Sequence, residues 1–168
     1  MKGTPCIGCG AVLPETEGPT HRYMESSPAC WAAYSEVLAR EFGDQDLFQR
    51  VHRFTVDTYA VHHPGRPSPQ SIQSVAVHLM SLCTLIEGGS TTTWAREIIR
   101  EAVRIKGRFV WLQPPASMGP VTVADVWGAK GAAEHEKAVM AWARSAWETW
   151  SPHHATIRTW CAMIRAPG

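Results

Sequence analysis

The sequence predicts an all-α fold, a bundle of about six helices, from two observations. Apolar residues recur at helical spacing in six stretches, and the short connections between these stretches carry Gly or Pro. Three of the stretches begin with Ser followed by Pro, at Ser27, Ser68 and Ser151. The serine hydroxyl can accept hydrogen bonds from the free amides of a first turn, and proline suits the first helical position because it has no amide hydrogen. No stretch supports a sheet.

The predicted helices follow in order from these starts and from the positions of Gly and Pro. They cover residues 28–42, 44–62, 69–87, 93–106, 132–150 and 152–165. Residues 108–112 are compatible with a short extended segment. Residues 122–127 are compatible with one helical turn that begins in a Thr-x-x-Asp capping box.

Length and composition predict a single domain, residues 1–168. The chain has 168 residues, of which 45% are hydrophobic and 18% charged, and eight are Trp. Such a composition suffices for one core and is unlike that of a disordered chain. We expect the Cys-rich segment 1–27 to pack on the helical bundle formed by residues 28–165.

The charge balance is not that of a nucleic-acid-binding protein. Lys and Arg number 16 and Asp and Glu 15, a formal net charge of +1, so no strong attraction to nucleic acid follows. The sequence contains no recognisable signal peptide and no apolar stretch long enough to span a membrane. We therefore expect a cytoplasmic protein without membrane contact, whose five cysteines stay reduced and are available as metal ligands.

The N-terminal cysteines have the spacing of zinc ligands. Cys6 and Cys9 form a C-x-x-C-G turn, in which glycine lets the backbone turn tightly around an ion. Cys30 follows about twenty residues later, in the first turn of the helix behind Ser27, where the helix dipole favours the thiolate. His21 lies between them in the sequence. The predicted zinc ligands are Cys6, Cys9, His21 and Cys30.

This pattern leaves the fourth ligand open, because it contains no second C-x-x-C pair. His52, His63 or another histidine can take the place of His21. Without a metal, the same residues would be two loop thiols and a buried helix cysteine. Four protein ligands would close the site and make it structural, since a catalytic zinc keeps an open position. A redox-active C-x-x-C pair is disfavoured because no βαβ pattern surrounds it.

Several stretches of the chain carry a resemblance to a known family. They are CIGCGA (residues 6–11), GPTHRYMESSPACW (18–31), VHRFTVDTYAVHHP (51–64), QSIQSVAVHLMSL (70–82) and WARSAWETWSPHHATIRTW (142–160). In them the sequence is similar to an uncharacterised bacterial family, a domain of unknown function with the N-terminal motif CxxCG...GPTHxYMxSSPxCW. The resemblance spans nearly the whole chain. It implies a small single-domain protein with this cysteine motif, and it brings no established reaction or catalytic residue.

The helix expected at residues 69–87 is unlike a surface helix, because no charged residue occurs from Pro67 through Ile86. Opposite its apolar stripe lie mostly neutral hydrogen-bonding side chains: Gln70, Ser71, Ser74, Val77, His78, Ser81 and Thr84. Two interpretations remain open. This face lines a polar pocket, or it packs against another helix with its hydrogen bonds satisfied internally.

Three histidines, His78, His135 and His153, are candidates for acid–base chemistry because we expect them to point inward. They could also converge with His154 and a histidine of the helix at residues 44–62 on a second metal site. The alternative is a core histidine that donates a hydrogen bond to a carbonyl. Asp57, one turn after Arg53, is expected to form a surface ion pair. It would orient a histidine only if another helix covered it.

Together these features predict a zinc-binding helical protein that binds or transforms a small molecule in a pocket lined by His, Ser and Gln. The alternative is a non-catalytic, zinc-stabilised protein-interaction module. The sequence does not decide whether the protein is an enzyme. A homo-oligomer is compatible with either hypothesis, and Zn is the cofactor that both require.

Overall fold

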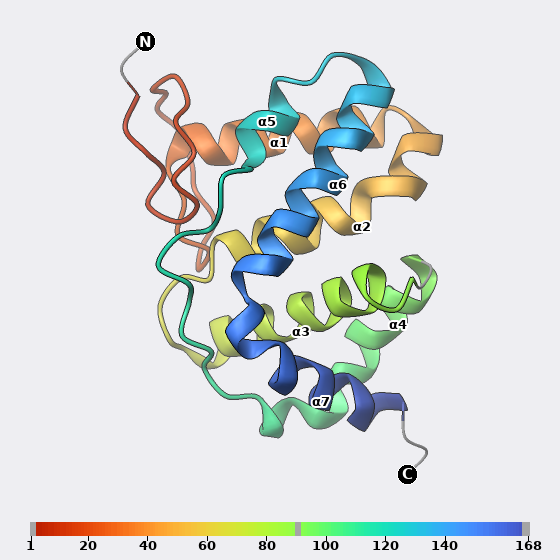
Figure 1. Ribbon diagram of the computed structural model, residues 1–168. Helices are drawn as coiled ribbons and strands as arrows, with labels where there is room; N and C mark the ends of the chain where they lie inside the picture. Colours follow the sequence, from red (N-terminus) through yellow and green to blue (C-terminus); the bar gives the residue numbers. More distant parts are fainter. Residues whose placement is uncertain (1–2, 90–91, 166–168) are drawn as a thin grey trace.

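The computed structural model describes residues 3–89 and 92–165, and these residues form an all-α protein (Figure 1). The α-helices are α1 (Pro28–Phe42), α2 (Gln45–His62), α3 (Pro69–Ile86), α4 (Thr92–Ala102), α5 (Val123–Trp127), α6 (Gly131–Thr149) and α7 (His154–Arg165). Two 3₁₀ helices, η1 (Val103–Arg108) and η2 (Ser151–His153), continue α4 and precede α7. The predicted fold class is confirmed. The additional α-helix is the single turn expected at residues 122–127.

Two of the three Ser-Pro helix starts have the predicted caps. The hydroxyl of Ser27 accepts a hydrogen bond from the Cys30 amide at 3.1 Å, and that of Ser68 accepts one from the Ser71 amide at 3.0 Å. The prediction for Ser151 is wrong, because its side chain caps no amide and the segment begins as the 3₁₀ turn η2. At α5, Thr122 and Asp125 form the expected capping box.

The fourth helix ends earlier than predicted. Regular α-helix stops at Ala102, and the residues up to Arg108 form the 3₁₀ helix η1 instead. None of the side chains of η1 is buried, so no apolar face holds this segment in an α-helix. After it, Phe109 has an extended backbone and a buried ring that contacts Trp160, yet residues 108–112 form no strand.

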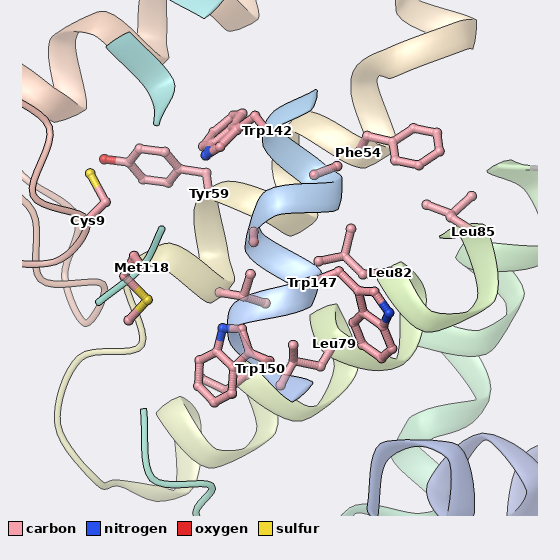
Figure 2. Close-up of a cluster of buried hydrophobic side chains, with 14 of the residues drawn as sticks. Cys9, Phe54, Tyr59, Leu79, Leu82, Leu85, Met118, Trp142, Trp147 and Trp150 are labelled. Carbon is pink, nitrogen blue, oxygen red and sulfur yellow. The ribbon is translucent and has the colours of Figure 1, made fainter. Parts of the chain in front are cut away.

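Helix α6 and its C-cap residue supply the largest side chains of the core. Trp142 and Trp147 of α6 and Trp150 at its C-cap are buried, and α6 packs on α2, α3 and α5. In Figure 2 the three indoles lie along α6, with Leu79 of α3 close to Trp150. Helices α4 and α7 pack on α3, which explains why α3 carries no charge on its apolar face.

The N-terminal segment, residues 3–27, has no helix and only one isolated β-bridge, between Pro5 and Val12. It lies against one end of α1, at the end of the molecule opposite α7 (Figure 1). A long connection that follows Phe109 runs from the α7 end towards α5, and its residues 114–118 border the same pocket as the turn at Cys6–Gly10. None of the helices in the described ranges has the length and apolar composition needed to cross a lipid bilayer.

Candidate metal centre

A tight N-terminal turn brings the first two cysteines together. The Cys6 amide donates to the Ala11 carbonyl and the Gly10 amide to the Cys6 carbonyl, both at 2.9 Å. Gly10 has a φ of 77°, which residues with a side chain rarely adopt. The turn therefore closes on itself through backbone hydrogen bonds, and both cysteine side chains are buried beneath it.

Two helices supply the remaining members of the cluster. Cys30 lies in the first turn of α1, where the Ser27 cap fixes the backbone. His63 follows the last residue of α2, and its Nδ1 bonds to the Tyr59 carbonyl at 2.8 Å. Because Nδ1 then carries the ring proton, Nε2 presents a lone pair to the sulfurs. Figure 2 shows Cys9 at the edge of the core, with the ring of Tyr59 pointing towards it.

Three of the six distances between the ligand atoms match those of a tetrahedral metal site. The sulfurs of Cys9 and Cys30 are 3.7 Å apart, and His63 Nε2 lies 3.6 Å from the Cys6 sulfur and 3.4 Å from the Cys30 sulfur. A tetrahedral zinc with ordinary bond lengths separates two sulfurs by about 3.8 Å, and a sulfur and a nitrogen by about 3.6 Å. All four ligand atoms lie within 4.8 Å of one another and all four residues are buried, so the group could hold a metal ion.

The electrostatics of the cluster favour a cation at its centre. Hydrogen bonds from the thiols of Cys30 and Cys9 lower the pKa of Cys6. The pKa of Cys30 is raised, mainly because Cys30 donates its hydrogen to Cys6. Without a cation, the three sulfurs therefore cannot all be thiolates. The Ser27 amide also donates to the Cys6 sulfur at 3.3 Å, and the Tyr59 hydroxyl to the Cys30 sulfur at 3.6 Å. These donors stabilise negative charge on sulfur.

The structure brings together three of the four residues assigned to zinc from the sequence. His21 is not in the group: its Nδ1 accepts hydrogen bonds from the amides of Tyr23 and Met24, and its ring packs against Trp31. His63 takes the fourth position, one of the alternatives that the sequence left open. Proximity in the sequence favoured His21, whereas the approach of His63 depends on how α2 packs against α1, which spacing does not encode.

Gly8 makes room for the ring of His63, the residue that follows α2. A Cβ at this position would collide with the ring of His63 and would lie 2.5 Å from the Glu25 carbonyl oxygen. We expect Gly8→Ala to displace His63, to cost about 1–3 kcal/mol of stability and to weaken metal binding. Gly10→Ala is the matched control, because a Cβ there meets nothing within 4 Å. It should retain the metal at a strain cost of about 1–2 kcal/mol. Competition titration with a chromogenic chelator measures both affinities, and equal affinities would contradict the prediction.

The structure separates the three candidate catalytic histidines. His135 Nε2 bonds to Glu41 at 3.0 Å, His153 Nε2 to the Gln113 carbonyl at 2.8 Å, and His78 Nδ1 to Asp57 at 2.7 Å. They do not converge on a second metal site. Within residues 3–89 and 92–165, the Cys/His cluster is the one group of three or more ligand atoms close enough to share an ion.

Asp57 corrects a prediction from the sequence. Its side chain pairs with Arg53 as expected, but the carboxylate is fully buried and not on the surface. Helix α3 covers it and supplies two further hydrogen bonds, from His78 and Ser81. The condition under which Asp57 would orient a histidine is therefore met.

A small pocket opens along α3 at His78. It has a volume of about 260 Å³ and is lined by Tyr23, Gln70, Gln73, Ser74, Val77 and His78. Each interpretation of the neutral face holds for some of its residues. Ser71 and Ser81 are buried and hydrogen-bonded, whereas Gln70, Ser74 and His78 line the pocket. Thr84 is buried, but its hydroxyl has no hydrogen-bond partner among the described residues.

The comparisons with known proteins locate the chain in one family. A family model described as a family of unknown function (DUF5946) matches residues 4–151. This range contains the cysteine turn, Cys30 and His63, and it ends at the start of η2. No curated protein and no solved structure matches the chain.

Proposed function

This chain belongs to the DUF5946 family, whose function is unknown, and from that premise we propose that it is a zinc-stabilised helical protein that binds a small molecule in the pocket along α3. The observation that carries the zinc proposal is the near-tetrahedral spacing of Cys6, Cys9, Cys30 and His63. Three thiolates and one imidazole are a ligand set typical of structural zinc. Because the protein fills all four positions, the ion has no open site for a substrate.

The metal acts by holding the N-terminal segment on the bundle. Among residues 3–27, the buried apolar side chains are few: Cys6, Cys9, Ala11 and Leu13. So small an apolar surface stabilises little, whereas four ligand bonds tie the segment to α1 and α2. The same segment carries Tyr23, which forms one wall of the α3 pocket. Zinc therefore supports the pocket indirectly.

The lining of the pocket indicates the kind of ligand. Gln70, Gln73 and Ser74 offer neutral donors and acceptors, and among the residues that the structure describes no Lys, Arg, Asp or Glu borders the space. Its volume is slightly below the range typical of drug-sized ligands, which is about 300–1,000 Å³. We infer a small, uncharged, polar ligand. The net charge of +1 supports a ligand other than nucleic acid.

Metal analysis of two histidine variants tests the zinc proposal. We expect one zinc per chain in the protein purified without chelator, a loss of stoichiometric zinc in His63→Ala, and its retention in His21→Ala. The physical reason is that only His63 presents a ring nitrogen to the sulfurs. Elemental analysis after gel filtration gives the ratio. Retention in His63→Ala together with loss in His21→Ala would reverse the assignment, and a metal-free native protein would refute the proposal.

A fragment screen tests the pocket. Small amides, polyols and neutral heterocycles are added to ¹⁵N-labelled protein, and we expect amide shifts concentrated at Gln70, Gln73 and Ser74. Gln73→Leu should abolish these shifts without lowering zinc content. If none of these compounds shifts the pocket residues, the ligand proposal fails and the zinc-stabilised interaction module becomes the better interpretation.

A further inference from the structure

Asp57 is surrounded by hydrogen-bond donors in the interface between α2 and α3. Its Oδ1 accepts from Arg53 at 2.6 Å and from His78 Nδ1 at 2.7 Å, and its Oδ2 accepts from Ser81 Oγ at 2.5 Å. The carboxylate has no exposed surface. Its position is therefore fixed before any ligand arrives.

His78 connects this buried carboxylate to the pocket. Its side chain is 19% exposed and lines the pocket beside Ser74, which lies one helical turn earlier on the same face of α3. The bond to Asp57 places the ring proton on Nδ1 and leaves the lone pair on Nε2. In the part of the chain that the structure describes, no group hydrogen-bonds to Nε2.

Two partners share the same oxygen of the buried carboxylate. Arg53 pairs with Asp57 Oδ1, and His78 Nδ1 donates to that oxygen as well. If Asp57 had only a structural role, its ion pair with Arg53 and its hydrogen bond from Ser81 would be sufficient to anchor it. Such a role would not require His78 to line a polar pocket with its Nε2 unpaired.

We propose that His78 is a catalytic base in the α3 pocket and that Asp57 positions it, an inference that rests on the proposed binding of a small molecule there. Because the described lining of the pocket is uncharged, the substrate class is a small neutral compound with a hydrolysable carbonyl group, of which an ester is the simplest. Nε2 of His78 takes a proton from water as the water oxygen bonds to the ester carbonyl carbon, which gives a tetrahedral intermediate. When this collapses, the carbon–oxygen bond to the leaving group breaks, and the imidazolium returns the proton to the departing oxygen.

Hydrolysis of p-nitrophenyl acetate by the zinc-loaded full chain tests the proposal. We expect saturable hydrolysis above buffer, and a loss of at least about tenfold in kcat/KM in His78→Gln, because a positioned base contributes on the order of 10²–10⁴ in rate. His153→Gln is the matched control, since that ring bonds to the Gln113 carbonyl outside the pocket and should leave the rate unchanged. Equal rates in the wild type and His78→Gln would overturn the proposal.

The role of Asp57 needs its own measurement. In the wild type we expect a downfield ¹H–¹⁵N signal from the Nδ1 hydrogen of His78. In Asp57→Asn that signal should disappear, and kcat should fall while KM stays unchanged. A normal kcat in Asp57→Asn would show that Asp57 is only structural. Should that variant not fold, Ser81→Ala removes one of the bonds that hold Asp57, and we expect it to lower kcat with the His78 ring still in place.

The fragment screen separates the two proposals. If fragments shift Gln70, Gln73 and Ser74 in both the wild type and His78→Gln but hydrolysis does not differ, the pocket binds ligands and the catalytic proposal is wrong. If no fragment binds, the proposed function itself has failed.

Discussion

Replacing Cys30 with serine is expected to abolish stoichiometric metal binding and to lower the melting temperature by about 10 °C or more. Cys30 contacts both Cys9 and His63 and is completely buried, so its loss removes the ligand through which the N-terminal turn meets α1. Structural zinc contributes on the order of 10 kcal/mol in small zinc domains. In a chain of this length, each kcal/mol of lost stability lowers the melting temperature by about 2–4 °C. A small part of the zinc contribution is therefore enough to give the expected shift.

A matched cysteine outside the cluster separates metal loss from a packing defect. Cys83 is also a buried thiol, yet it lies on α3 and belongs to no metal-ligand group. Cys83→Ala should keep one metal per chain and melt within a few degrees of the wild type. Limited proteolysis measures the N-terminal segment directly. Cleavage within residues 11–26 should be faster in Cys30→Ser than in the wild type, and should be unchanged in Cys83→Ala. An unchanged metal content in Cys30→Ser would contradict the assignment of this ligand.

The sequence predicts local features of this protein well because they depend on neighbouring residues. The Ser27 and Ser68 caps and the Thr122 capping box are satisfied by amides two or three positions away. The clustering of Cys6 and Cys9 likewise requires only a turn that their own segment closes. Ser151 fails as a cap because α6 ends at Thr149 and the 3₁₀ turn η2 begins directly at Ser151, so the N-cap position falls on Trp150.

Features that depend on two helices meeting were predicted less well. Asp57 and Arg53 form a pattern that is ordinarily exposed, and only the position of α3 shows that the carboxylate is buried. The sequence likewise points only weakly to the burial of Glu41, which lies near the end of α1 between Arg40 and Phe42, neither of them buried. A weak signal did exist for both: an unusually large number of histidines, several of which were expected to face inward and therefore needed partners.

Glu41 joins three helices through its carboxylate. Oε1 accepts from Thr55 Oγ1 of α2 at 2.5 Å and from His135 Nε2 of α6 at 3.0 Å, and Oε2 accepts from His52 Nδ1 of α2 at 2.7 Å. The residue itself belongs to α1 and is fully buried. Burial alone would raise the pKa of Glu41, but the hydrogen bonds from His135, His52 and Thr55 outweigh it and lower the pKa below its usual value.

Glu41→Gln is therefore expected to destabilise the protein by about 3–5 kcal/mol, because it removes the charge from a buried, hydrogen-bonded group. The amide group of the new glutamine also places N–H donors next to His52, Thr55 and His135, which are themselves donors to Glu41. The matched control is Glu36→Gln on the same helix. Glu36 is exposed and accepts one hydrogen bond from Trp127 Nε1, so we expect a loss within about 1 kcal/mol. Urea unfolding at neutral pH measures both variants.

The pH dependence of stability gives the second test of Glu41. Its pKa in the folded protein is lower than in the unfolded chain, so the unfolded chain takes up the proton first as the pH falls. The stabilisation is complete above the unfolded value, near 4.5, and is lost as the pH falls through the folded value. The wild type should therefore lose stability below about pH 4.5 more steeply than Glu41→Gln, which has no proton to bind there. Parallel stability curves for the two proteins between neutral pH and pH 3 would show that the carboxylate of Glu41 does not hold these helices together.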